Sequence, residues 1–112
     1  MGGGFGQAGG IAPDTPETYL LDVNYVFDPA KDRTNRTKHG VSLALAEVLF
    51  AGPHSSVVDD RFDYGELREI AFGFVNNRMF VCVYVDRAGE RRVISLRKAN
   101  QREVKIHGED LE

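Results

Sequence analysis

The residues from 68 to 98, REIAFGFVNNRMFVCVYVDRAGERRVISLRK, form three apolar runs that are separated by two short polar interruptions. Runs of this length that are rich in valine, isoleucine, phenylalanine and tyrosine are typical of β-strands. Asn76-Asn77 and Arg87-Ala88-Gly89 are typical of the short connections between neighbouring antiparallel strands. The spacing therefore predicts an antiparallel meander of three strands, over residues 68–75, 79–86 and 91–97.

Helices are predicted on both sides of this meander. Asp28 and Pro29 indicate a helix start, because a carboxylate caps free backbone N–H groups and proline has no N–H to leave unpaired. Gly40 predicts the end of that helix, and Ser42 caps a second helix that Gly52-Pro53 ends. Two further strands, over residues 25–27 and 56–59, and a last helix over residues 100–107 complete the pattern. The predicted fold class is α+β, a small antiparallel β-sheet flanked by helices in the order βααββββα.

The length and composition of the chain indicate a globular protein. Its 112 residues suffice for one core, and we divide them into a flexible glycine-rich tail over residues 1–24 and a folded domain over residues 25–112. The single cysteine, Cys82, excludes an internal disulfide and a paired-cysteine motif, which favours a reduced, cytoplasmic setting. No apolar run reaches the ~20 residues of a membrane span, and the N-terminus lacks the pattern of a secretion signal.

Charge is distributed unevenly along a chain whose formal net charge is −3. Residues 29–41 hold four bases and one acid, residues 91–105 hold six bases and one acid, and four acids gather in residues 59–66. Within the first helix, Lys31, Asn35 and Lys38 recur at helical spacing and form a polar face. Two interpretations stay open at this point, since such segments are either solvated faces or walls of a phosphate-binding groove.

Strand alternation sorts the side chains of residues 91–97 onto two faces. One set is Arg92, Ile94 and Leu96, and the other is Arg91, Val93, Ser95 and Arg97. With Ile94 and Leu96 expected in the core, Ser95 and Arg97 share the more open face, close to Arg68 on a neighbouring strand. Converging guanidinium groups grip phosphate oxygens well, although each could instead pair with an acid from residues 59–69.

Four ordered blocks of this chain, between residues 25 and 107, resemble the BrnT family of toxins from bacterial toxin–antitoxin systems. The two most specific blocks are Lys38-His39-Gly40-Val41-Ser42 and Ile94-Ser95-x-Arg97-Lys98-Ala99, and the others are Phe27 to Lys31 and Arg68 to Gly73, with Glu103 after them. The resemblance implies a RelE-like ribonuclease fold, RNA cleavage and growth arrest. It also implies neutralisation by a BrnA-like antitoxin, with operator DNA contacted only through the toxin–antitoxin complex.

The resemblance further implies which residues contact RNA. It places Lys38, His39, Arg68, Ser95 and Arg97 at the RNA site, with Arg92 as a further candidate. His107 stands near the end of the last helix, where family members often have a tyrosine. Lys31 and Lys98, with Lys38, Arg91 and Arg97, are expected to surround a groove that also offers a docking surface for an acidic or amphipathic antitoxin segment.

A metal-independent ribonuclease of this kind makes the 2′-hydroxyl of the RNA attack the adjacent phosphorus, so no cofactor is expected. The reaction needs a base for the hydroxyl proton, cations for the charge on the phosphorane and an acid for the departing 5′-oxygen. Lys38 or His39 is the candidate base or acid, and Arg68 and Arg97 are the candidate charge stabilisers. A histidine beside a glycine is also common as a plain helix end.

Other functions compete with this interpretation. Asp59, Asp60 and Asp63 could bind magnesium for a metal-dependent nuclease, although their closeness on one loop favours a turn. Residues 38–42 could join two helices as in a DNA-binding helix-turn-helix, but the second helix lacks polar residues that read bases. A non-catalytic module that binds nucleic acid or a partner in transcriptional autoregulation is the main alternative.

Overall fold

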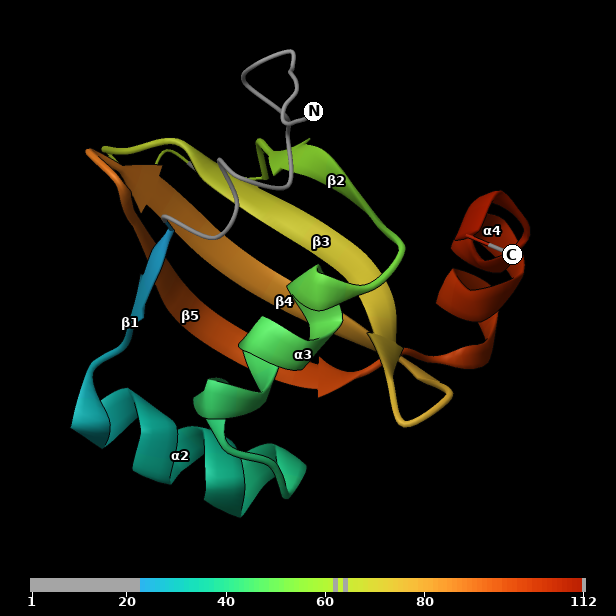
Figure 1. Ribbon diagram of the computed structural model, residues 1–112, viewed down its shortest axis with the longest axis horizontal. Coiled ribbons are helices and arrows are strands. Elements are labelled where there is room, and N and C mark those ends of the chain that lie inside the picture. Colours follow the sequence, from blue (N-terminus) through green and yellow to red (C-terminus); the bar gives the residue numbers. More distant parts are fainter. Residues whose placement is uncertain (1–22, 62, 64, 112) are drawn as a thin grey trace, which may run out of the picture.

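The three-stranded meander is the centre of the fold in the computed structural model, which describes residues 23–61, 63 and 65–111 (Figure 1). Strands β3 (Arg68–Val75), β4 (Arg78–Arg87) and β5 (Glu90–Lys98) pair antiparallel, as predicted. Asn76 and Asn77 have φ of 51° and 63°, the left-handed values that a two-residue hairpin turn requires. The tail expected over residues 1–24 lies outside the described residues, apart from its last two positions.

Two short strands extend the sheet to five strands in the order β1-β5-β4-β3-β2. Strand β2 (His54–Asp59) pairs antiparallel with β3, but β1 (Asn24–Val26) pairs parallel with β5, with Tyr25 beside Arg91. The sheet is therefore mixed, and the prediction of a purely antiparallel sheet is wrong for β1. Because no hairpin joins β1 to β5, nothing local imposes the antiparallel direction. The parallel direction lets the chain continue after β1 alongside the rest of β5.

The helices begin and end close to their predicted positions. In α2 (Pro29–His39), Asp28 Oδ1 accepts a hydrogen bond of 2.8 Å from the Ala30 N–H, and Gly40 closes the helix at φ 76°. The second predicted helix is divided into a 3₁₀ turn, η1 (Leu43–Leu45), and α3 (Ala46–Ala51). The last helix, α4 (Gln101–Leu111), follows β5 directly. Figure 1 shows α3 over one face of the sheet, α2 along the edge formed by β5, and α4 at the opposite side of the molecule.

Helix α2 is held by buried polar side chains, not by an apolar stripe. Asp32 Oδ1 accepts hydrogen bonds from the Leu43 N–H (2.7 Å) and the Ser42 hydroxyl (2.9 Å), which lowers the pKa of Asp32. The Asn35 amide donates to the Leu96 carbonyl (2.7 Å) and accepts from the Leu96 N–H (3.1 Å), so it pairs with β5 beyond the end of β1. Asn35, expected on a polar face with Lys31 and Lys38, is only 4% exposed and is a structural residue.

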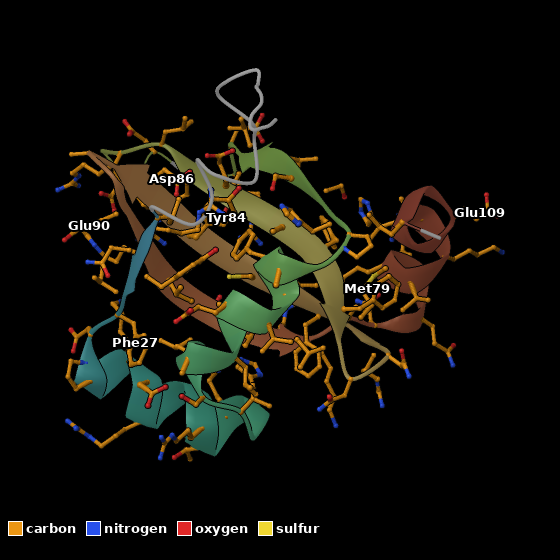
Figure 2. All side chains as sticks on the ribbon, in the orientation of Figure 1. Phe27, Met79, Tyr84, Asp86, Glu90 and Glu109 are labelled. Carbon is orange, nitrogen blue, oxygen red and sulfur yellow. The ribbon has the colours of Figure 1, made fainter. Side chains whose placement is uncertain are left out.

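The two faces of the sheet carry separate apolar clusters. The cluster under η1 and α3 includes Leu43, Leu49, Phe50, Cys82, Tyr84 and Leu96. The opposite face, which we call the open face, holds Phe72, Met79 and Val81, and Leu111 of α4 packs against them. Figure 2 shows Met79 at the side of the sheet near α4 and Phe27 where β1 leads into α2. The Cys82 thiol is buried, which raises its pKa to about 12 and leaves it protonated at neutral pH.

Candidate functional site

A β-bulge in β5 decides which of its side chains share a face. Val83 pairs with Ser95 and Tyr84 pairs with Val93, so Ile94 is the extra residue of the bulge. Because of this extra residue, the side chains on the two sides of the bulge no longer alternate between the two faces of the sheet as in a regular strand. As a result Val93, at 1% exposure, lies in the core, whereas Ile94 is only half-buried. The prediction that Ile94 belongs to the core was wrong for this reason.

The bulge brings Arg92, Ser95 and Arg97 to one face. These three residues pair with Val85, Val83 and Val81 of β4, which alternate with the core residues Tyr84 and Cys82. The predicted pairing of Ser95 and Arg97 on the open face is therefore seen. Arg92, predicted on the face with Leu96, joins them, because a bulge turns side chains that would otherwise point to the opposite side.

Two adjoining hollows lie between α2 and the sheet, and we call them together the α2 groove. The first has a volume of about 350 Å³ and is lined by Ala30, Lys31, Thr34, Asn35, Lys38, His39, Ile94 and Ser95. The second has a volume of about 380 Å³ and is lined by Val26, Phe27, Asp28, Lys31, Glu66, Arg68, Arg92 and Ile94. Six of the nine residues predicted at the site therefore line one or the other of these two adjoining hollows.

Basic side chains of the groove are available for a ligand. Within the part of the chain that the structure describes, Lys31, Lys38 and Arg92 make no ion pair. The two carboxylates of the second hollow have other partners, since Asp28 caps α2 and Glu66 accepts a 2.8 Å hydrogen bond from Arg87. The groove therefore combines cations that are open to an anionic ligand with acids that are already engaged.

The remaining predicted residues lie outside the groove, two of them where α4 meets the sheet. Glu103 accepts hydrogen bonds of 2.9 and 2.8 Å from the Arg97 guanidinium, which lowers the pKa of Glu103 and raises that of Arg97. Glu103 and Asn100 also cap α4 reciprocally, at 2.9 and 2.8 Å. His107 stacks on Phe72, with ring centroids 3.7 Å apart. We call these five residues the α4 junction.

Two other basic residues of β5 differ from their predicted placement. Arg91, expected on the rim of the groove, lies over the rings of Phe50 (4.3 Å) and Tyr84 (4.6 Å) on the face that α3 covers. Two hydrogen bonds of 2.7 and 2.9 Å tie it to Asp86, and its side chain is only 11% exposed. Lys98 is exposed at the end of β5, opposite Phe80 and outside both hollows.

The acidic segment after β2 is used for local structure. Asp59 is buried and accepts two hydrogen bonds from the Arg61 side chain, at 2.7 and 2.9 Å. Asp63 accepts a 3.0 Å hydrogen bond from the N–H of Gly65, whose φ of 74° is left-handed. These contacts fit the turn that the sequence favoured. Among the described residues, no group of three histidine, cysteine or acidic side chains is arranged to hold a metal ion.

A protein-family model described as the ribonuclease toxin BrnT of type II toxin–antitoxin systems matches residues 27–103. This span contains every lining residue of the first hollow and all but Val26 of the second, and it ends at Glu103, so that His107 lies beyond it. No curated protein matches the chain. No helix in the described ranges is long and apolar enough to cross a membrane.

Proposed function

The chain belongs to the BrnT family of ribonuclease toxins from type II toxin–antitoxin systems, and from this premise we propose that it is an endoribonuclease that cuts RNA in the α2 groove. The observation that carries this proposal is the convergence of Lys31, Lys38, His39, Arg68, Arg92 and Ser95 on the two hollows. Such a set of N–H and O–H donors suits a phosphodiester, because cations and hydroxyls bind its oxygens and stabilise added charge.

The proposed chemistry needs no group from outside the chain. Lys38 and His39 stand together at the end of α2 in the first hollow, where one takes the 2′-hydroxyl proton and the other protonates the 5′-oxygen. Arg68 and Arg92, in the second hollow, stabilise the charge that builds on the phosphorane oxygens. Because the attacking group is the 2′-hydroxyl, DNA is not a substrate.

Arg97 has a more limited part in this proposal. It shares the open face with Arg92 and Ser95, and so extends the cationic surface toward α4. A guanidinium has five N–H groups, and three hydrogen bonds to Glu103 and the Lys98 carbonyl occupy its Nη1 and Nη2 atoms. We propose that Arg97 contacts RNA through its remaining N–H groups and that His107, stacked on Phe72, contacts an adjacent base.

Incubation of the purified protein with RNA, with and without EDTA, tests the activity. Cleavage should survive the chelator and leave ends that carry a 2′,3′-cyclic phosphate. Cleavage that depends on magnesium and leaves 5′-phosphate ends would instead favour a metal site built on Asp59, Asp60 and Asp63. Binding of RNA without any cleavage would favour the non-catalytic alternative.

We further propose that the protein acts in the cytoplasm and that a BrnA-like antitoxin covers part of the same basic surface. Binding there would block RNA sterically and neutralise the positive charge of the surface. Operator DNA would be contacted only by the toxin–antitoxin complex. In a competition binding experiment, RNA and the antitoxin should exclude each other. Lys31→Glu combined with Lys98→Glu should lower the affinity of the protein for both. Lys105→Glu, on an exposed position of α4, is the control. Unchanged antitoxin affinity in the double variant would place its contacts elsewhere.

A further inference from the structure

The two hollows of the α2 groove meet at a shared boundary. Lys31 and Ile94 line both of them, and no other described residue does. Lys31 reaches the boundary from the first turn of α2, and Ile94 reaches it from the bulge of β5. The boundary therefore consists of an exposed ammonium group on one side and a half-buried apolar side chain on the other.

The hollows differ in the chemistry of their walls. Thr34, Lys38, His39 and Ser95 bring hydroxyl, ammonium and imidazole groups to the first hollow. In the second hollow, Val26 and Phe27 supply apolar surface beside the guanidinium groups of Arg68 and Arg92. Each volume, about 350 and 380 Å³, is at the lower end of the range for small-molecule sites, roughly 300–1,000 Å³. Each hollow therefore suits one small unit of a ligand, and the pair suits two joined units.

We propose that the hollows are subsites for two consecutive nucleotides of single-stranded RNA, with Lys31 on the phosphate that joins them and Ile94 between the two bases. This inference rests on the proposed function of the groove. Proteins that read single-stranded RNA splay its bases apart, and an apolar side chain at the boundary replaces the stacking that the two bases lose. Lys38 and His39 line the first hollow on one side of that phosphate, and Arg68 and Arg92 line the second hollow on its other side, so the proposal makes the bond between the two subsites the one that is cut.

A length series of RNA oligomers tests this arrangement on the full chain. Each oligomer carries hydrogen in place of every 2′-hydroxyl that precedes a phosphate, which prevents cleavage, and affinity is measured by titration calorimetry for one, two and three nucleotides. Affinity should rise at least about tenfold from one to two nucleotides, the gain of one charged hydrogen bond, and much less from two to three. A uniform rise with each added phosphate would overturn the proposal.

Two variants identify the boundary residues. Lys31→Ala should remove most of the rise in affinity between one and two nucleotides, which we call the step. Lys105→Ala, on an exposed position of α4, should leave the step unchanged. Ile94→Ala should also reduce the step, and an unchanged melting temperature shows that the loss is local. If both variants keep the full step, the subsites lie elsewhere even when RNA is cleaved. If the step is present and sensitive to both residues but RNA is never cleaved, the subsites stand and the proposed nuclease activity fails.

Discussion

The α2 groove and the α4 junction both contain basic side chains, but they differ in whether those side chains make ion pairs. In the groove, within the described residues, Lys31, Lys38 and Arg92 make no ion pair. At the junction, both oxygens of Glu103 bind Arg97, and the same carboxylate caps α4. A cation in the groove can meet a phosphate at once, whereas a phosphate at the junction must compete with a carboxylate that is already in place.

Adjacent residues of β5 show the same contrast at closer range. Arg91 points to the face under α3, where Asp86 and two aromatic rings hold it. Burial by itself would lower the pKa of Arg91. The hydrogen bonds to Asp86 and the negative charge of Asp86 outweigh burial, so the pKa of Arg91 is raised. Arg92 points to the open face and lines the second hollow. Two arginines in sequence thus lie in a structural ion pair and beside the groove respectively, because alternation sends them to opposite faces.

The largest expected effect lies in the groove. Lys38→Ala combined with His39→Ala should lower the rate of RNA cleavage by roughly 10²–10⁴-fold, the usual contribution of general acid–base catalysis. Single-turnover cleavage of a labelled RNA measures this rate, with Lys105→Ala as the control. A rate that stays within a few-fold of wild type would remove both residues from the chemistry.

The polar anchor of α2 should have the largest effect on stability. Asn35→Ala leaves the buried N–H and carbonyl of Leu96 without their partner, which should lower the free energy of unfolding by about 3 kcal/mol. Urea denaturation measures the change. Thr34→Ala, at an exposed position of the same helix, should stay within about 0.5 kcal/mol of wild type. Equal stability of the two variants would show that α2 does not depend on this pairing.

Truncation of Arg97 should mainly reduce stability, whereas truncation of Arg92 should mainly reduce RNA cleavage. Arg97→Ala removes the bidentate ion pair that docks α4, so it should lower the free energy of unfolding by about 1 kcal/mol. Arg92→Ala should change stability by less than about 0.5 kcal/mol but reduce RNA cleavage more than Arg97→Ala does. Denaturation and cleavage measured on both proteins decide this. A greater loss of cleavage in Arg97→Ala would move the centre of the site toward α4.

The smallest expected effect is a pH dependence at the α4 junction. Arg97, and then the Asn100 N–H, lower the pKa of Glu103 in the folded protein below its unfolded value of about 4.3. Its stabilising contribution is therefore complete above that pH and is lost as the pH falls through the folded pKa. The stability difference between wild type and Glu103→Gln should be constant near pH 7 and shrink below about pH 4. A difference that does not change with pH would indicate that the carboxylate charge contributes little.

Local signals in the sequence were enough for the elements of the fold and for part of the site. Asp28, Pro29 and Gly40 act within a few residues of where they stand, so the bounds of α2 were predicted well. The two turns of the meander were predicted for the same reason. Lys38 and His39 also come together locally, because they are neighbours at one helix end. For these features, the physical cause lies in the short range of capping and turn geometry.

What the tertiary structure decided depends on residues that are distant in sequence. The parallel pairing of β1 with β5 and the hydrogen bonds of Asn35 to Leu96 join segments about 60 residues apart. The bulge at Ile94 has no glycine or other local marker, yet it turns Arg92 to the open face and so completes the groove. Whether a given arginine is open to a ligand or held by an acid likewise depends on partners such as Asp86 and Glu103. The sequence alone determined which basic and hydroxyl side chains this protein has, and only the packing of its strands and helices decided which of them face a common hollow.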